Sequence, residues 1–358
     1  MKNKSKVILT IFMVCVPFIL SSLLLTSCNK QRQLDEVEFI IDWEPGIDYI
    51  GYYVADEKGF YEDEGIKIQF KHVNGAPLSA ELIGLGKAFI GTTTADQVIL
   101  ARAKKEGDQS SETEEEGLSI KAVATIFSQN PIVITSLDPY PISKIEKLNG
   151  KKLGMNAGSV TYKQYLLIEK NEKYNLKSVQ HIDIGWGETE QLLHGQINAL
   201  LAYVMERPVS LRLQLIKEND KRKVHVLSLK DIDPSLNIIG QVIAAYEPAL
   251  ADPRKRNLVE KVVRASLKGW DYVKKYQGKE GQPQDPLTYY RKRYPTQEKK
   301  YLAGSLKETL PLVPTEVTKY GINEADWSTA ITAMEAMEII KEGTYVPFDF
   351  YIKLDQFQ

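Results

Sequence analysis

The feature that most constrains the fold is an alternation of strand-like and helix-like segments that occurs twice. In the first half, strands are expected over 37–41, 66–70 and 88–92, and helices over 49–58, 78–85 and 96–105. In the second half, strands are expected over 152–155, 181–184 and 199–203, and helices over 162–170 and 188–194. Such alternation with short connections predicts an α/β protein whose mostly parallel strands are covered by helices on both faces.

Short sequence words also recur between the halves, which favours two similar α/β lobes. The segment 86–91 (GKAFIG) mirrors 195–200 (GQINAL), and each reads as a helix end followed by a buried strand. One long doubly wound sheet is the alternative. After 241–245 the pattern becomes helical, with an amphipathic helix expected over 255–275 and further helices near 297–306 and 327–340.

The charge balance and the cysteine and histidine counts exclude several classes of protein. Lys+Arg 46 against Asp+Glu 47 gives a net charge of -1, so no nucleic-acid partner is expected. Two cysteines do not make a disulfide scaffold or a Cys-rich zinc module. The four histidines lack the spacing of a metal pair, so neither a metal nor a cofactor is expected.

The N-terminus is built like an export signal. Three lysines within the first six residues precede an acid-free apolar run over 7–25, which ends in Leu25-Thr26-Ser27-Cys28. This tetrapeptide resembles the bacterial lipobox. The resemblance implies a signal peptide over 1–27 and a lipidated Cys28, acylated by a diacylglyceryl group and a fatty acid such as palmitate. We expect a protein anchored to the membrane on its extracytoplasmic face; a transmembrane anchor is the alternative.

No catalytic motif is complete in this sequence. The serine-hydrolase elbow, the P-loop and the zinc-protease helix are absent. The glycine pattern Gly84, Gly86 and Gly91 begins before an expected strand, whereas the glycines of a dinucleotide-binding fingerprint follow a strand. The acidic run 110–116 contains no bulky apolar residue and is typical of a solvated loop. We therefore expect a protein that is not an enzyme.

Aromatic residues gather near the start of the expected first lobe. Trp43 follows the first strand, at the sheet edge where open α/β sheets bind ligands, and Tyr49 and Tyr53 are one helical turn apart. Aromatic faces of this kind could hold a planar heterocycle. Alternatively, the tyrosines belong to the core or the surface.

The segment 42–65, DWEPGIDYIGYYVADEKGFYEDEG, resembles the opening motif of solute-binding proteins of the thiamine-pyrimidine precursor family, which also includes eukaryotic synthases. Further matching segments follow in order: 81–87 (ELIGLGK), 127–131 (FSQNP), 148–154 (LNGKKLG) and 195–199 (GQINA). Gly46 and Tyr49 depart from the family's asparagine and histidine. The cysteine-rich segment of the synthases is missing, so their iron-dependent chemistry is not carried over.

The resemblance implies a type II periplasmic-binding-protein fold, in which two α/β lobes joined by a two-strand hinge close on one ligand. The implied boundaries are 36–134 for the first part of lobe 1, 135–240 for lobe 2, and 241–358 for the rest of lobe 1 with the C-terminal helices. The implied partners are a small-molecule ligand, an ABC permease and its cytoplasmic ATPase.

The resemblance also implies a ligand site. Trp43 and Tyr53 match positions that flank the ligand, and Glu206, in the segment that begins at Tyr203, matches an acidic position facing an aminopyrimidine. A carboxylate suits that task because it accepts hydrogen bonds from an exocyclic amine. Four further contacts are expected from Tyr203, from the amides of Gly158 and Ser159, and from Gln129. Glu206 could instead be an exposed partner of Arg207.

These observations favour an importer component that captures a thiamine pyrimidine precursor of the formylaminopyrimidine or hydroxymethylpyrimidine type. Riboflavin, and sulfonate or nitrate, are the alternative ligands. An anion would call for a converging basic residue or exposed helix N-termini more than for an aromatic sandwich. An exported pyrimidine-synthesis enzyme, or a sensory or adhesive lipoprotein, is a more distant alternative.

Overall fold

The computed structural model describes residues 33–103, 117–185, 189–279, 281–314 and 321–354. The chain divides into two compact units, Met1–Asp35 and Glu36–Gln358, and the second contains the sheets and helices described below. The proposed signal peptide, the lipobox and the acidic run 110–116 lie outside the described residues. Within the described part, no helix is long and apolar enough to cross a membrane.

The first sheet has five strands in the order β2-β1-β3-β10-β4. Its strands are β1 (Asp35–Ile41), β2 (Ile66–His72), β3 (Ile90–Thr94), β4 (Ile120–Thr125) and β10 (Gln241–Tyr246). β1 pairs with β3 in parallel, with Ile40 opposite Gly91, whereas β10 runs antiparallel to both β3 and β4. A strand from late in the sequence therefore completes the sheet built by the first part of the chain.

The second sheet has five strands in the order β7-β6-β8-β5-β9. Its strands are β5 (Ile132–Leu137), β6 (Lys152–Met155), β7 (Gln180–Asp183), β8 (Ala199–Tyr203) and β9 (Val224–Ser228). β6 pairs in parallel with β7 and β8, and β5 runs antiparallel to β8 and β9. The chain thus passes between the sheets twice, after β4 and before β10, as the expected fold requires.

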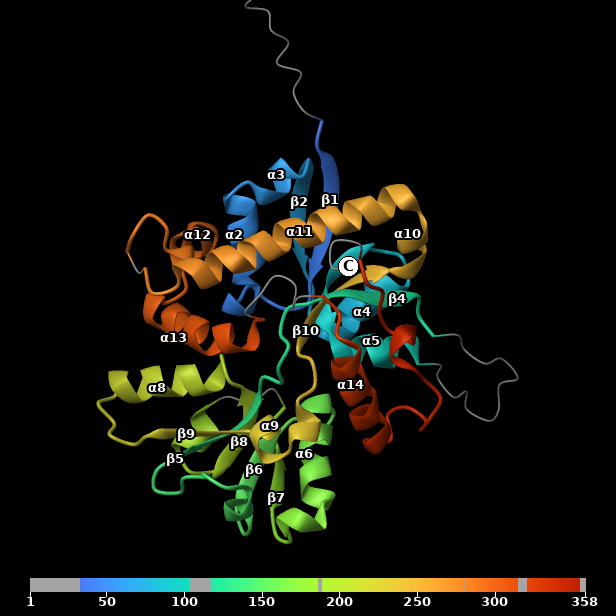
Figure 1. Cartoon of the computed structure of the whole chain (residues 1–358). Coiled ribbons are helices and arrows are strands. Elements are labelled where there is room, and N and C mark those ends of the chain that lie inside the picture. The colour runs from blue at the N-terminus through green and yellow to red at the C-terminus, as the bar shows by residue number, and fades with distance from the viewer. Residues whose placement is uncertain (1–32, 104–116, 186–188, 280, 315–320, 355–358) are drawn as a thin grey trace, which may run out of the picture. The chain divides into compact units, whose positions relative to one another are not determined.

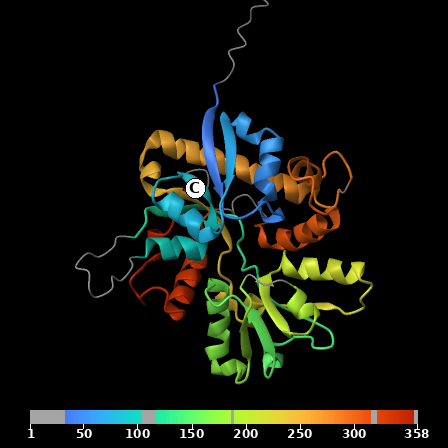
Figure 2. The same ribbon diagram turned by 180° about the vertical axis from the view of Figure 1, so that it is seen from behind.

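Helices cover both faces of each sheet (Figure 1; the reverse view is Figure 2). In the first part of the chain they are α2 (Ile50–Glu57), α3 (Phe60–Asp63), α4 (Ala76–Gly84) and α5 (Ala95–Arg102). Next come α6 (Val160–Lys170), α7 (Glu190–Leu193), α8 (Arg207–Lys217) and α9 (Leu229–Ile232). The C-terminal helices are α10 (Glu247–Ala251), α11 (Pro253–Tyr276), α12 (Pro286–Arg293), α13 (Lys299–Thr309) and α14 (Glu324–Ala336). Short 3₁₀ helices include η1 (Ile47–Tyr49), η4 (Pro234–Leu236) and η5 (Leu310–Leu312).

The first sheet is buried on both faces because neighbouring strand residues point in opposite directions. Ile41 packs in the core that contains α2 and α11, and Ile40 packs in the core that contains α4, α5 and α14. α11 lies across β1 and β2 in both views (Figures 1 and 2). Gly269 of α11 lets this helix approach α2 closely, since a Cβ there would meet the Gly51 carbonyl oxygen.

The fold class expected from the sequence is confirmed, because the structure has two separate α/β sheets and C-terminal helices. The alternative of one long sheet is excluded among the described residues. The strands 152–155 and 199–203 have the expected bounds, and the helix expected over 255–275 is α11. The helix expected from residue 49 begins instead at Ile50, because Tyr49 closes the separate turn η1.

Candidate functional site

The first sheet contributes a buried carboxylate at the point where β1 ends. Asp42 directly follows β1 and is 6% exposed. The Thr92 hydroxyl of β3 donates a hydrogen bond to the Asp42 carboxylate, and the Asp42 amide donates to the Thr92 hydroxyl oxygen at 3.0 Å. Burial raises the pKa of Asp42 even though these hydrogen bonds and one from Tyr49 oppose the shift. An acidic side chain whose ionised form is disfavoured by burial thus lies at the carboxyl ends of the parallel strands β1 and β3.

Turn η1 adds a second carboxylate next to Asp42. Asp48 folds back over Gly46, and a Cβ at residue 46 would lie 2.1 Å from Asp48 Oδ1. The departure from the family's asparagine at Gly46 therefore leaves space for Asp48. Burial raises the pKa of Asp48 well above its usual range, and the nearby charges of Glu206 and Asp42 raise it further. The Gln241 side chain of β10 donates to the Asp48 carbonyl oxygen at 3.4 Å.

The second sheet presents Tyr203 and Glu206 where β8 ends. The Glu206 amide donates to the Tyr203 carbonyl oxygen at 3.0 Å, which closes a tight turn before α8. Burial raises the pKa of Glu206, and Arg207 partly opposes the shift. Burial also raises the pKa of the Tyr203 hydroxyl, with contributions from the charges of Asp96, Glu206 and Asp42. Acidic side chains from the two sheets therefore lie within electrostatic range of one another. We call this set, Asp42, Asp48, Asp96 and Glu206, the acidic group.

Trp43 lies at the rim of this group, and its side chain is exposed. It is 37% exposed, and its carbonyl oxygen accepts a hydrogen bond from His72 Nδ1 at 2.7 Å. Because a carbonyl can only accept, this contact places a proton on Nδ1 and leaves Nε2 near the hydroxyls of Tyr294 (3.2 Å) and Tyr53 (3.3 Å). His72 thus links the backbone of Trp43 to the aromatic side chains of Tyr53 and Tyr294.

Tyr49 and Tyr53 are both buried, but they have different neighbours. Tyr49 is buried, and its hydroxyl is hydrogen-bonded to the Asp42 carboxylate, so it belongs to the acidic group. Tyr53 is completely buried and its ring packs against Tyr290 and Tyr294. A direct contact between Tyr53 and a ligand stays a prediction, and its present neighbours are protein side chains.

The backbone amides expected at the N-terminus of α6 already have acceptors. The Gly158 amide donates to Asn156 Oδ1 at 3.1 Å, and the Ser159 amide donates to the Asn156 carbonyl oxygen at 3.1 Å. The Ser159 hydroxyl caps the helix by accepting from the Tyr162 amide. Gln129 is half-buried in the link between the sheets. The contacts of Gly158, Ser159 and Gln129 with a ligand stay predictions.

Three carboxylates of this group were not identified from the sequence: Asp42, Asp48 and Asp96. Asp42 was available as a signal, because it follows a buried strand at the edge where ligands bind. Asp96 stands in the first turn of α5 directly after β3, which is the equivalent position on the next strand. Burial raises its pKa as well. Nothing in the sequence indicates that Asp48 folds back toward the same place.

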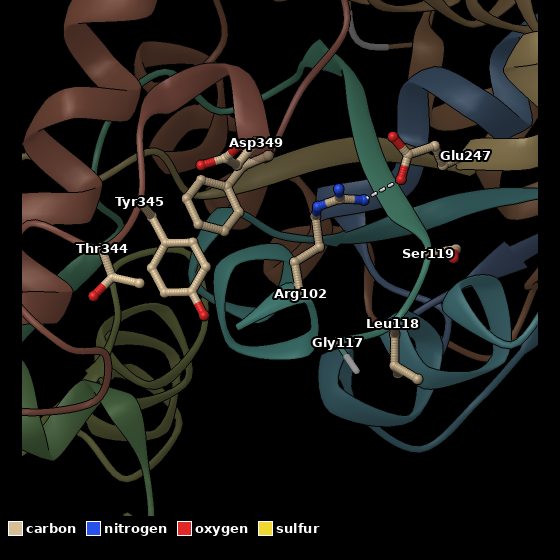
Figure 3. A pocket seen from close by; sticks show the side chains of 9 residues that line it. Arg102, Gly117, Leu118, Ser119, Glu247, Thr344, Tyr345 and Asp349 are labelled. Atoms are coloured by element: carbon tan, nitrogen blue, oxygen red, sulfur yellow. Dashed lines mark hydrogen bonds and ion pairs between the residues drawn. The ribbon is translucent and has the colours of Figure 1, made fainter. Parts of the chain in front are cut away.

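A cavity of about 450 Å³ lies elsewhere, between the end of α5, the start of β4, α10 and the C-terminal segment (Figure 3). Arg102 lines it and already pairs with Glu247 at 2.5 Å, and Tyr345 and Asp349 form the opposite side. Because none of these residues lies at the carboxyl ends of the parallel strands, we assign the candidate site to the acidic group and Trp43. Among the described residues, no group of three or more metal-ligating side chains is arranged to hold a metal ion.

Comparisons with known proteins identify the family of this chain. The family model described as NMT1/THI5 like matches residues 47–279. Riboflavin-binding protein RibY of Chloroflexus aurantiacus is 28% identical over 245 residues, which are 67% of this chain and 63% of that protein, less than two thirds of its length. A second relative is 22% identical over 67% of each chain: 4-amino-5-hydroxymethyl-2-methylpyrimidine phosphate synthase THI13 of Saccharomyces cerevisiae.

Solved structures share the fold. The periplasmic aliphatic sulphonate binding protein SsuA of Escherichia coli has a TM-score of 0.60 and 17% identity, over 86% of this chain and 94% of that one. The alkanesulfonate-binding SsuA of Xanthomonas axonopodis, bound to MOPS, has a TM-score of 0.58 and 11% identity, over 89% and 99%. The fold is that of periplasmic binding proteins. The chain belongs to the NMT1/THI5-like family.

Proposed function

We propose that this protein is the substrate-binding component of an ABC importer and captures a small nitrogen heterocycle that carries an amino group. The best candidate ligand is a thiamine pyrimidine precursor. The observation that supports the proposal is the convergence of one buried and several half-buried carboxyl groups near the carboxyl ends of strands from both sheets. The two sheets with their helices then act as two lobes that close on the ligand, and closure is favoured by the contacts that only the closed form makes.

The charge of the site favours a ligand that donates hydrogen bonds. Burial raises the pKa of all three carboxyl groups, Asp42, Asp48 and Glu206. For Asp48, the charges of Glu206 and Asp42 raise it further. Ionisation of each group is therefore unfavourable without a partner. An amino-substituted heterocycle supplies N–H donors and can take a positive charge on its ring, which offsets that cost. A sulfonate or nitrate would instead place a negative charge beside these carboxylates. The ligand of the SsuA structures is therefore a poor guide for this chain.

Riboflavin remains the second candidate, because a relative is named for binding it. It is also a planar heterocycle, and its ring system carries one N–H donor. Binding without conversion is expected for either compound, in contrast to the synthases of the same family. Because residues 1–28 have the features of an export signal, we further propose that the protein is tethered by lipidated Cys28 outside the cytoplasm.

A ligand panel tests the proposal directly. Thermal unfolding of residues 29–358 is measured with 4-amino-5-hydroxymethyl-2-methylpyrimidine, its formylamino analogue, riboflavin, taurine and nitrate. A ligand at 100 times its dissociation constant adds about 2.7 kcal/mol to the free energy of unfolding, which is a rise of several degrees. Protection by taurine or nitrate alone contradicts the proposal. Chemical conversion of the recovered pyrimidine would identify an enzyme.

Replacement of Trp43 by alanine tests the aromatic part of the site. We expect Trp43→Ala to weaken binding of the protecting heterocycle about tenfold, because a stacked ring contributes roughly 1 kcal/mol beyond its buried area. The melting temperature without ligand should stay close to that of the parent, since the side chain is exposed. Tyr140→Ala is the control, because Tyr140 is 52% exposed and follows β5, which is a strand of the second sheet. Equal affinities of the parent and Trp43→Ala would remove Trp43 from the site.

A further inference from the structure

The turn that carries Glu206 is held by residues of the first sheet's core. Met205 follows β8 of the second sheet, yet its side chain is 3% exposed and packs in the cluster that contains β1, α2 and α11. That cluster also contains Leu302 and Leu306 of α13. Met205 therefore enters the apolar core of the other half of the protein, one residue before a proposed ligand-binding carboxylate.

A buried hydrogen bond holds the same residue from the backbone side. The Ser305 hydroxyl of α13 donates to the Met205 carbonyl oxygen at 2.8 Å, and Ser305 is 3% exposed. A carbonyl that is buried without a donor is costly, so this bond matters more than an equivalent bond at the surface. The Val204 amide donates to the Pro131 carbonyl oxygen at 2.9 Å, which fixes the turn on its other side.

Helix α13 connects this turn to the rest of the site. It packs against α8, which begins at Arg207, and against η1, which contains Asp48. Gly304 allows the close approach to α8, because a Cβ there would lie 2.8 Å from Val209 Cγ1. At the rim of the same contact, Arg212 of α8 pairs with Glu308 of α13 at 2.7 Å. One helix therefore contacts the elements that carry both carboxylates.

We propose that Met205 and Ser305 form a clasp that positions Glu206 and holds the two halves together around the ligand. The inference rests on the proposed function, because it takes Glu206 as a ligand contact. When the halves separate, the Met205 side chain meets water and its carbonyl exchanges Ser305 for water. The clasp therefore stabilises the closed arrangement only, and it does so with or without ligand. Its energetic effect appears as a slower release of the ligand.

The test compares Ser305→Ala with Thr309→Val. Thr309 is a matched control, because its buried hydroxyl donates within its own helix, to the Ser305 carbonyl oxygen. We expect Ser305→Ala to raise the dissociation rate of the heterocycle that protects the parent about tenfold, as expected for a lost hydrogen bond that leaves a buried carbonyl unpaired. Thr309→Val should leave that rate unchanged, even where it lowers the melting temperature.

A second measurement follows closure without any ligand. Spin labels are placed at Lys163 of α6 and Lys255 of α11, which are both exposed, on the full chain with Cys15 and Cys28 replaced by serine. The distance distribution should gain a longer component in Ser305→Ala and a larger one in Met205→Ala, but none in Thr309→Val. Identical distributions in all four proteins would overturn the clasp. This readout remains valid if the heterocycles fail to bind, so the clasp and the proposed function are tested separately.

Discussion

Replacement of Glu206 by glutamine is expected to weaken binding of the aminopyrimidine by about 10- to 150-fold. A hydrogen bond to an ionised group contributes about 1.5–3 kcal/mol, and glutamine keeps the shape of the side chain while removing the charge. The amide also brings an N–H donor toward the ligand's own donors. Isothermal titration calorimetry of the parent and the variant at pH 7.5 measures the difference.

The pH dependence of binding gives a second readout for the same residue. Burial raises the pKa of Glu206, so on acidification its carboxylate takes up a proton at a higher pH than a solvent-exposed glutamate does. The affinity of the parent for an aminopyrimidine should therefore fall on acidification, and the fall should be smaller in Glu206→Gln. The control is Glu218→Gln, which removes the same charge from the exposed end of α8. A parent-like affinity and pH profile for Glu206→Gln would contradict a ligand role for Glu206.

Most strands and helices were predictable because each follows from the local pattern of apolar residues. The strand 199–203 is an apolar run with a helix end before it, and α11 repeats apolar residues at helical spacing, so each pattern identifies its element without knowledge of the rest. The return of β10 to the first sheet was available only through the family resemblance. Pairing between β10 and β3 joins residues about 150 positions apart, and no local pattern encodes such a partner.

The candidate site was predictable only in part, for a physical reason. Glu206 could be found because it stands in a recognisable segment, whereas Asp48 lies in a turn whose path depends on Gly46 and on the Gln241 side chain. The spacing of Tyr49 and Tyr53 did not show how deeply each side chain lies: Tyr49 closes a separate 3₁₀ turn, and both side chains are buried.

Replacement of Asp48 by asparagine is expected to stabilise the ligand-free protein while it weakens ligand binding. Burial and the charges of Glu206 and Asp42 raise the pKa of Asp48 in the folded state. A raised pKa means that the folded state holds its proton more tightly than the unfolded chain. Asp48 therefore contributes stability at low pH that is lost as the pH rises through the folded pKa. Asparagine cannot ionise and avoids this loss.

Unfolding with guanidinium at several pH values checks the sign. At pH 7.5, Asp48→Asn should exceed the parent by about 1–2 kcal/mol, the size of gain that follows when a site gives up a costly functional group. The difference should disappear below about pH 4, where the carboxyl is protonated in both states. Glu44→Gln is the control, because it removes an exposed carboxylate from the same loop and should change little at any pH. If Asp48→Asn is less stable than the parent at neutral pH, the acidic group is a structural network and not a site for an amino-bearing ligand.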